Sequence, residues 1–193
     1  MSFNLEDLKK ALGFGTNPSS KLESLDIDGI SKLILSGQVK RVITMVGAGI
    51  STAAGIPDFR SSSSGIYDNL EEFNLPNPMA VFSIDYFRRN PKAFFEVARR
   101  LYRPEAKPTL AHYFIRLLHE KGILLRHYTQ NVDNLERLSG LPEEKLIEAH
   151  GTFNTGHCID CKEQYDFQFM LGKIMAKKIP VCVKCQGVVK PGE

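Results

Sequence analysis

Residues 42–60 read VITMVGAGISTAAGIPDFR, an apolar segment that runs directly into a glycine turn and then into polar residues. The segment Val42–Val46 is short, continuous and rich in β-branched side chains, which is typical of a parallel strand buried on both faces. Gly47 and Gly49 lack a Cβ, so the backbone can turn sharply there and bring its N–H groups close to a ligand. A helix opening over Ile50–Ala54 would point the positive end of its dipole at the same place, and we expect it to bind a phosphate.

This turn departs from the dinucleotide fingerprint of dehydrogenases, which is GxGxxG followed about 20 residues later by an acid that ends a second strand. Thr52 stands at the position of the third glycine, and the chain further on reads SSSSGIYDNL, a loop composition with no strand to end. In the intervening GIPDFR, the ring of Phe59 lies between the charges of Asp58 and Arg60, which a plain connector does not need. We therefore interpret the stretch as a ligand site.

The length and composition of the chain limit the kinds of protein that it can be. The chain has 193 residues, a hydrophobic content of 42% and a net charge of +3, which suits one domain with a small insertion. The charge is too small to indicate direct binding of nucleic acid. Since no apolar run approaches the roughly 18 residues of a membrane span, and the N-terminal MSFNLEDL is acidic rather than signal-like, we expect an intracellular protein without a membrane partner.

Secondary structure can be predicted along most of the chain. Residues 1–29 read as a flexible N-terminal leader, followed by a helix over Ile30–Leu35. Residues 61–78 form a long loop of the kind that covers a site. Met79–Tyr102 contains helical segments whose phenylalanines at 82, 87, 94 and 95 belong in the core, and Thr109–Glu120 forms a helix capped by its first residue. The side chains expected to share one side of that helix are Phe114, Leu117 and Leu118.

Three apolar runs each end in a polar cluster. Val42–Val46 precedes the glycine turn, Ile123–Thr129 leads into QNVDN, and Lys145–Ala149 leads into a His-Gly pair. In open α/β sheets the ligand crevice lies outside the carboxyl ends of the strands. We therefore expect the three clusters to meet in space, and they consist of Gly47–Ser51, Gln130–Asp133 and His150.

Within these clusters His150 is a candidate general base, because it follows a strand end beside a glycine. Asn131 and Asp133 can offer an amide and a carboxylate to a planar amide ligand. The alternative is that Asp133 or Asn134 caps a short helix over NLERL. We interpret the other histidines as structural, namely His112, His119, His127 and His157.

All four cysteines occur in two pairs, Cys158-x-x-Cys161 and Cys182-x-x-Cys185, with 20 residues between the pairs. Two such pairs place four thiolates around a tetrahedral Zn²⁺ at about 2.3 Å. Disulfides are the alternative, but nothing in the sequence points to secretion. Because four sulfur ligands leave no open coordination position, we interpret the metal as structural and do not expect hydrolysis at zinc.

Taken together, five motifs in this order resemble the sirtuins, the NAD-dependent protein lysine deacylases: GAGIS, GIPDFRS, TQNVD, HG and the paired CxxC. The resemblance covers roughly residues 30–191. It implies an α/β fold with a Rossmann-like parallel sheet, partial here, over residues 30–150, and a small zinc-binding module over residues 151–191. The cofactors implied are NAD and zinc, with an acyl-lysine peptide in the cleft between the two domains.

The resemblance also assigns roles to residues. His150 is the catalytic base, which deprotonates a ribose hydroxyl after the acyl oxygen has displaced nicotinamide from the ribose; lysine, nicotinamide and 2′-O-acyl-ADP-ribose then leave. Phe59 covers the reactive carbon of the ribose and keeps water away. The residues assigned to NAD are Gly47, Ala48, Gly49, Ser51, Asp58, Phe59, Arg60, Tyr67, Gln130, Asn131, Val132 and Asp133. Those assigned to zinc are Cys158, Cys161, Cys182 and Cys185.

The stretch from Gly65 through Pro78 looks most like the cytoplasmic branch of the family, which implies acetylated-lysine protein substrates of the histone or tubulin type and a location in the cytoplasm, with the nucleus as a second compartment. In the family the sequence after GVVKP continues into a second Rossmann half, whereas this sequence reads PGE at residues 191–193. We therefore expect a C-terminally truncated form that lacks the rest of the Rossmann domain, exposes apolar strand faces, binds NAD weakly and is inactive by itself. Two alternatives stay open: an inactive short isoform that acts as a zinc-containing interaction protein, and an ADP-ribosyltransferase.

Overall fold

The computed structural model describes residues 22–56, 73, 75 and 77–192, and separates the chain into two units, residues 1–40 and 41–193. In the first unit, helix α2 (Ile27–Leu35) begins after Asp26, whose carboxylate accepts the N–H of Gly29 at 2.8 Å. The helix thus starts three residues earlier than the predicted Ile30, because Asp26 is the residue that caps it. The leader predicted for residues 1–29 therefore overlaps the helix at its end, and residues 1–21 lie outside the described part of the chain.

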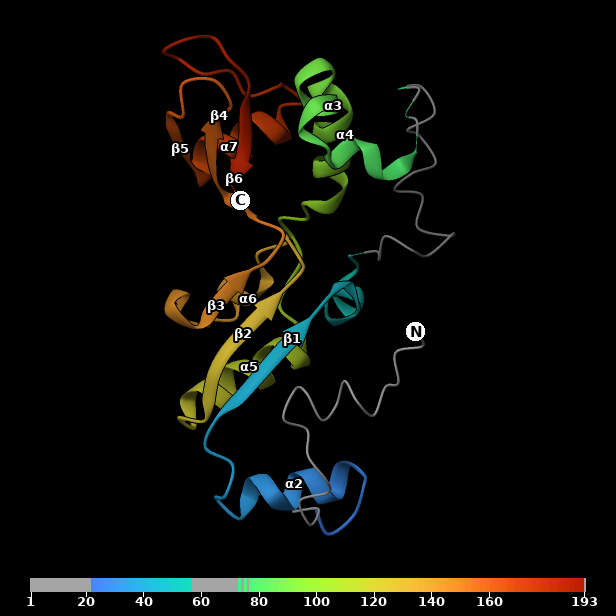
Figure 1. Cartoon of the computed structure of the whole chain (residues 1–193), viewed down its shortest axis with the longest axis vertical. Helices are drawn as coiled ribbons and strands as arrows, with labels where there is room; N and C mark the ends of the chain where they lie inside the picture. The colour runs from blue at the N-terminus through green and yellow to red at the C-terminus, as the bar shows by residue number, and fades with distance from the viewer. Residues whose placement is uncertain (1–21, 57–72, 74, 76, 193) are drawn as a thin grey trace, which may run out of the picture. The chain divides into compact units, whose positions relative to one another are not determined.

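The second unit contains a parallel sheet with the strand order β1-β2-β3 (Figure 1). The strands are β1 (Val42–Val46), β2 (Leu124–Thr129) and β3 (Leu146–Glu148), and each lies within a run that predicts it. Thr129 stands opposite both Val46 and Glu148. Because the three strands end level, the segments that follow them leave the sheet at one edge.

The two faces of this sheet differ. Side chains of β1 alternate in burial, and Ile43 and Met45 are 59% and 73% exposed. The prediction of a strand buried on both faces is therefore wrong for the described residues. Across the strands the same open face carries Tyr128 and Ile147, which stand in register with Met45.

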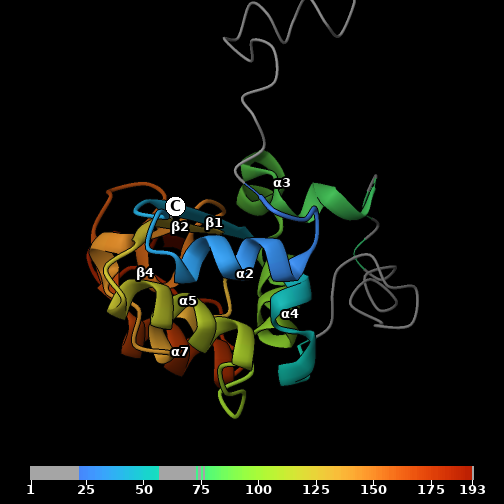
Figure 2. The ribbon, with the colours of Figure 1, turned by 90° about the horizontal axis from the view of Figure 1, so that it is seen from below.

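The other face is covered by helix α5 (Leu110–Glu120), which packs against β2 (Figures 1 and 2). Thr109 caps this helix as predicted, and His112 completes the cap because its Nδ1 accepts the N–H of Thr109 at 3.1 Å. The side chains that α5 buries are His112, Ile115 and Leu118. Phe114 and Leu117, expected on the same side of the helix as Leu118, are 53% and 45% exposed. The buried side of α5 includes a histidine, so the pattern of apolar residues alone predicts the wrong side.

A second sheet is antiparallel, with the order β5-β4-β6. Its strands are β4 (Thr152–Cys158), β5 (Gln164–Asp166) and β6 (Val189–Gly192), and helix α7 (Phe167–Met175) packs on β4. Gly156 of β4 allows that packing, because a Cβ there would lie 2.4 Å from Sδ of Met170. The parallel sheet ends at Glu148 and the antiparallel one begins at Thr152, which makes the molecule the predicted α/β fold with a small second module.

Aromatic side chains fill the core next to this module. They come from the 3-10 turn η4 (Pro78–Phe82) and from helices α3 (Ile84–Arg89) and α4 (Pro91–Leu101). Phe87 and Phe95 are buried, and both pack edge-on against Phe94 with ring centres 5.2 and 5.4 Å apart. The core prediction is thus confirmed for these rings, whereas Phe82 is 37% exposed. In the described residues no helix has the length and apolarity needed to cross a bilayer.

Candidate active site and zinc centre

The three polar segments meet at the carboxyl edge of the parallel sheet, as predicted. The N–H of Gln130 donates to the carbonyl of Val46 at 3.0 Å, which ties the segment after β2 to the end of β1. The N–H of Ala149 donates to the carbonyl of Thr129 at 2.9 Å, which ties the segment after β3 to the end of β2. Backbone hydrogen bonds therefore fix the segments relative to one another before any ligand binds.

The first segment is built from two 3-10 turns, η1 (Ala48–Ile50) and η2 (Thr52–Ala54), rather than the predicted helix from Ile50 to Ala54. Gly55 has φ 80°, so the backbone turns left-handed after a single turn and cannot continue as a helix. Short turns carry little dipole, which leaves the backbone N–H groups as the main donors for an anion. Gly47 allows a close approach, because a Cβ there would lie 3.3 Å from Oε1 of Gln130.

Ser51, Asn131 and Asp133 form one hydrogen-bonded group behind this edge. The buried hydroxyl of Ser51 donates to Oδ2 of Asp133 at 2.7 Å. The side-chain amide of Asn131 donates to Ser51 Oγ at 3.3 Å and to the carbonyl of Gly47 at 3.0 Å. The group therefore locks the segments after β1 and β2 together through side chains as well as backbone.

Of the two alternatives that the sequence left open for Asp133, the structure shows the helix cap, together with a hydrogen bond from Ser51. Its Oδ1 accepts the N–H of Leu135 at 3.0 Å and so fixes the first turn of helix α6 (Leu135–Leu138), while its Oδ2 accepts from Ser51. Asn134 takes the left-handed backbone with φ 69°, and its side chain accepts from Asn154 instead of capping. Burial raises the pKa of Asp133, and the hydrogen bonds from Leu135 and Ser51 oppose that shift.

His150 lies two residues after β3, and its side chain is exposed to solvent. Its Nδ1 lies 2.9 Å from the carbonyl oxygen of Gln130. Because a carbonyl only accepts hydrogen bonds, Nδ1 carries the proton and Nε2 is the nitrogen with a free lone pair. The ring is therefore oriented with a proton acceptor available, which is the arrangement that a general base needs.

A cleft of about 1280 Å³ opens beside these residues. Its polar side consists of Gly47, Ala48, Gly49, Gln130, Asn131, Val132 and His150. Its apolar side consists of Phe82, Phe94, Val97, Ala98 and Leu101, with Lys190 to Gly192 of β6 completing the lining. Ser51 and Asp133 do not line it. They lie behind Asn131 and hold it, so their geometry supports a positioning contribution.

Four of the residues assigned to NAD by resemblance cannot be placed. Asp58, Phe59, Arg60 and Tyr67 lie outside the described residues, as does most of the loop predicted to cover the site.

The four cysteine sulfurs gather in one place, all within 4.8 Å of one another. Sγ of Cys158 lies 3.4 Å from that of Cys185, and Sγ of Cys161 lies 3.5 Å from that of Cys182. These distances exceed the roughly 2.05 Å of a disulfide. They approach the edge of about 3.8 Å that a tetrahedron with 2.3 Å zinc–sulfur bonds requires. The donor set therefore fits zinc, and the disulfide alternative does not hold.

The two pairs have the same local geometry. Lys162 follows Cys161 with φ 64°, and Gln186 follows Cys185 with φ 62°. In each knuckle the N–H of that residue donates to the carbonyl of the first cysteine of the pair, at 3.1 and 3.0 Å. The hydroxyl of Tyr165 hydrogen-bonds to Cys182, which lowers the pKa of that thiol to about 6. Metal binding requires the thiolate, so the module presents at least one ligand in the form that binds.

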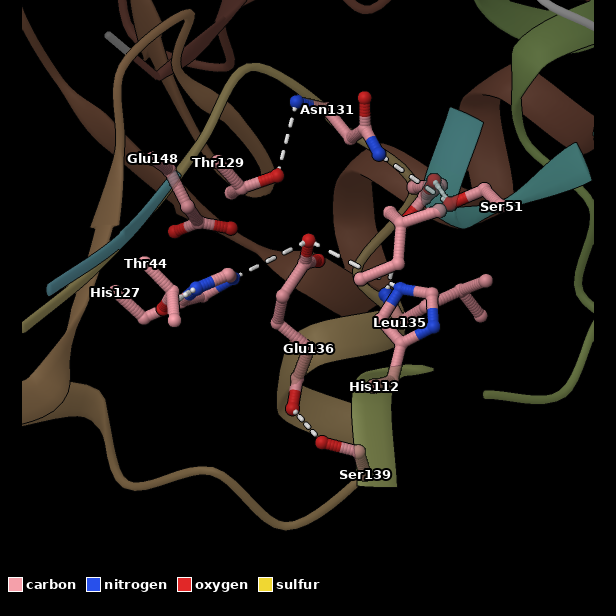
Figure 3. A network of polar contacts seen from close by, with 12 residues as sticks. Thr44, Ser51, His112, His127, Thr129, Asn131, Leu135, Glu136, Ser139 and Glu148 are labelled. Atoms are coloured by element: carbon pink, nitrogen blue, oxygen red, sulfur yellow. Dashed lines mark hydrogen bonds and ion pairs between the residues drawn. The ribbon is translucent and has the colours of Figure 1, made fainter. Parts of the chain in front are cut away.

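Sequence reasoning missed one feature of the site, a buried polar cluster beneath the strand ends (Figure 3). It contains Thr44, His112, His127, Thr129 and Glu136, the last only 2% exposed. Interpreting the two histidines as structural was reasonable for each alone. A signal was present in the alternation of β2, where His127 and Thr129 are buried while Arg126 and Tyr128 on the opposite face are exposed.

Comparison with known protein families gives a match to the Sir2 family over residues 47–192. The chain belongs to the Sir2 family. This Sir2 chain is 52% identical over 180 residues to the NAD-dependent protein deacetylase sirtuin-2 of Danio rerio, an alignment that covers 92% of this chain and 48% of that protein. It is 52% identical over 168 residues to the NAD-dependent protein deacetylase hst2 of Schizosaccharomyces pombe, covering 87% and 51%. It is 48% identical over 179 residues to mouse sirtuin-3, covering 93% and 53%.

These alignments confirm the resemblance found from the motifs. The Sir2 chain spans about half the length of the curated relatives that it matches. The matched region contains the segments that follow the three parallel strands, His150 and all four cysteines. NAD dependence is part of the names of these relatives, and the four-cysteine cluster provides a zinc site of the predicted composition.

Proposed function

We propose that this chain carries the nicotinamide and acyl-lysine side of an NAD-dependent protein lysine deacetylase. The observation that carries the proposal is the meeting of His150 with the Gly47 turn and the Asn131 segment on one wall of a cleft of about 1280 Å³. In this function the turn and Asn131 bind the ribose and nicotinamide of NAD. The cofactor supplies the electrophilic ribose carbon, and the chain supplies orientation and a base.

The proton acceptor on His150 supports its assignment as that base. With Nδ1 donating to the Gln130 carbonyl, Nε2 can take a proton from a ribose hydroxyl, and the same hydrogen bond stabilises the ring once it is charged. The exposure of the ring lets a ligand reach it without opening the sheet.

The apolar wall of the cleft supports an acyl-lysine as the second substrate. Phe82, Phe94 and Leu101 offer a surface for the methylenes of the lysine and for its uncharged acyl group. A free lysine ammonium would lose hydration on that surface without gaining a partner there. The wall therefore favours the acylated over the unmodified side chain.

We propose acetylated proteins of the histone or tubulin type as substrates, and the cytoplasm, with the nucleus as a second compartment, as the location. Both rest on the similarity of residues 65–78 to the cytoplasmic branch, and the names of the relatives add only that those proteins are protein deacetylases. Zinc, held by the four cysteines, would stabilise the small module and take no part in the reaction, because its coordination is complete.

The test supplies the second half of the domain from the Danio rerio relative, joined to the chain, with NAD and acetylated histone or tubulin peptides. Mass spectrometry follows loss of the acetyl group and release of nicotinamide. His150→Ala should lower turnover at least about 100-fold, the usual contribution of a general base. His119→Ala, a partly exposed histidine on α5, is the control and should leave turnover unchanged.

Near-normal turnover by His150→Ala would remove the base from the proposal. Nicotinamide release with transfer of ADP-ribose to the peptide would favour the ADP-ribosyltransferase alternative. Absence of any NAD-dependent chemistry, with zinc bound and the fold intact, would favour an interaction protein.

A further inference from the structure

His150 belongs to a hydrogen-bonded backbone turn at the end of β3. The N–H of Gly151 donates to the carbonyl of Glu148 at 3.0 Å, and Gly151 has φ 83°, so residues 148–151 form a turn with His150 as its third residue. The side chains of Ala149 and His150 are both exposed. The direction of the imidazole therefore depends on how firmly the turn itself is held.

The strand that carries this turn is short. β3 has three residues, and among the described strands it pairs with β2 alone, at the edge of the parallel sheet. The last backbone link to β2 is the N–H of Ala149, which donates to the carbonyl of Thr129. Since backbone pairing ends where the turn begins, the side chain of Glu148, the first residue of the turn, becomes an additional anchor.

The side chain of Glu148 points to the covered face of the sheet. It follows Leu146 by two residues, and Leu146 belongs to the core that α5 covers. Thr129, which stands opposite Glu148 in the sheet, is buried on the same side (Figure 3). The side chain of Glu148 is only 11% exposed. A charge in such a position is costly unless a group of opposite charge binds it.

Arg137 supplies that group. Its Nη2 donates to Oε2 of Glu148 at 2.7 Å, and its Nε donates to Oε1 at 3.4 Å. Two parallel contacts of this kind fix the orientation of both groups as well as their separation. Nη2 of Arg137 also lies 3.4 Å from Glu143, but that side chain is 80% exposed, so solvent screens the interaction. Glu148 is therefore the partner that holds the guanidinium.

Helix α6, which carries Arg137, is itself attached to the polar wall of the cleft. It begins after Asp133, whose carboxylate accepts the N–H of Leu135 and the hydroxyl of Ser51. Leu135 is completely buried, which anchors the helix from below. The ion pair of Arg137 with Glu148 thus connects the segment after β2 to the turn after β3.

The imidazole of His150 makes a second connection between the same two segments, because its Nδ1 donates to the carbonyl of Gln130. Without the guanidinium, the carboxylate of Glu148 has to turn toward water, and the turn that starts at this residue moves with it. Nδ1 then loses its acceptor. A neutral imidazole without that hydrogen bond shifts its proton to Nε2, which removes the lone pair that a general base needs.

We propose that Arg137 and Glu148 are positioning residues for His150: their ion pair holds the turn so that Nδ1 donates to the carbonyl of Gln130 and Nε2 stays a proton acceptor. The role of His150 as the base rests on the proposed function, whereas the tautomer of its ring does not.

The test is the tautomer of His150 in the purified chain, measured from the ¹⁵N shifts of its ring nitrogens at alkaline pH. Arg137→Met keeps a long apolar stem and loses the guanidinium. We expect the ratio of the Nδ1–H to the Nε2–H tautomer to fall at least about fivefold, the equivalent of one lost hydrogen bond. The amide of Gly151, which closes the turn, should exchange faster, while the amide of Gln130, which donates to Val46, keeps its protection.

Arg99→Met is the matched control. Arg99 lies on α4, its side chain is 26% exposed against 27% for Arg137, and it forms an ion pair with Glu96. This variant should leave the tautomer of His150 as in the native chain. A variant with both Arg137→Met and Glu148→Met has no unpaired charge left on the covered face and is expected to fold. Because methionine is flexible, it does not restore the orientation, and the altered tautomer should persist.

Turnover gives a second readout in the chain completed with the second half of the Danio rerio relative. Arg137→Met should lower kcat several-fold and leave the KM for the acetylated peptide nearly unchanged, because the apolar wall is not altered. A native tautomer ratio in Arg137→Met, or in the double variant if the single one does not fold, would overturn the proposal. So would an equal change in Arg99→Met, or a native chain whose His150 carries its proton on Nε2. Normal turnover by His150→Ala would count against the proposed function alone, because the tautomer is measured without NAD.

Discussion

The parallel-sheet region, residues 41–151, and the cysteine module, residues 152–192, achieve order by different means. In the first, three level strand ends are joined by backbone hydrogen bonds and by side-chain hydrogen bonds such as that of the buried Ser51 to the half-buried Asp133. In the second, short strands and one helix surround a sulfur cluster whose four atoms lie within 4.8 Å. We therefore expect the stability of the sheet region to depend on many weak contacts, and that of the module to depend mainly on the metal centre at the four cysteines.

Because of this difference, we expect the two regions to respond differently to amino-acid substitutions. Loss of one hydrogen bond in the sheet region costs about 1 kcal/mol and should shift a side chain without unfolding the region. Loss of one metal ligand removes a contribution that is on the order of 10 kcal/mol in small zinc domains. Substitutions of similar size in the two regions can therefore test whether stability is concentrated or spread.

The largest effect is expected from Cys182→Ser. The purified chain should hold about one zinc, and this variant should lose it and unfold the module, because three thiolates cannot complete the tetrahedron. Metal analysis and limited proteolysis measure the result, with new cleavage expected inside residues 152–192 and none inside β2. A variant that keeps its zinc and its resistance to protease would show that the module does not depend on the fourth sulfur.

A smaller effect within the same module comes from two glycines. Gly156→Ala brings a Cβ to 2.4 Å from Sδ of Met170 and 3.1 Å from the carbonyl of Lys190, and should destabilise by about 1–3 kcal/mol because a backbone atom cannot move aside easily. Gly172→Ala in α7 meets nothing within 4 Å and should stabilise by up to about 1 kcal/mol. Thermal unfolding of the zinc-loaded protein compares them. Equal effects of the two would mean that the sulfur cluster alone determines the stability of the module.

The same contrast explains what the sequence could predict. The cysteine spacing predicts the zinc centre because four ligands at fixed intervals have few other arrangements. The strand ends were also predictable, since level parallel strands must bring Gly47, Asn131 and His150 to one edge. The cluster around Glu136 was not, because it depends on the rotation of α5 set by the Thr109 cap. That rotation buries His112 and exposes Phe114, against the apolar pattern.

The open face of β1 has a different cause. A continuous apolar run carries no information about which face will be covered, because Ile43 and Val42 are equally apolar and only neighbouring elements distinguish them. In the described residues Ile43 and Met45 are the exposed side chains of this face. The predicted weak binding of NAD and lack of activity stay predictions.

The smallest expected effect is on how the folding stability of the sheet region depends on pH. Burial lowers the pKa of His112 from 6.5, its neighbour His127 lowers it further, and the charges of Glu136 and Asp133 oppose the shift. Below pH 6.5 the unfolded chain therefore binds a proton that the folded chain does not, so stability falls as the pH drops through that value.

His112→Gln keeps an acceptor for the Thr109 cap, as glutamine does at this position of a capping box, but cannot titrate. Its stability should depend less on pH between 6.5 and 5, by at most about 1.4 kcal/mol per pH unit. Urea unfolding followed at the amides of β2 measures this slope separately from the cysteine module, and comparing variants cancels the opposite contribution of Asp133, whose pKa burial raises. His119→Gln, on the same helix, should keep the native slope. Equal slopes for the native protein and His112→Gln would show that the buried imidazole does not resist protonation, and that the sheet region owes its pH response to other groups.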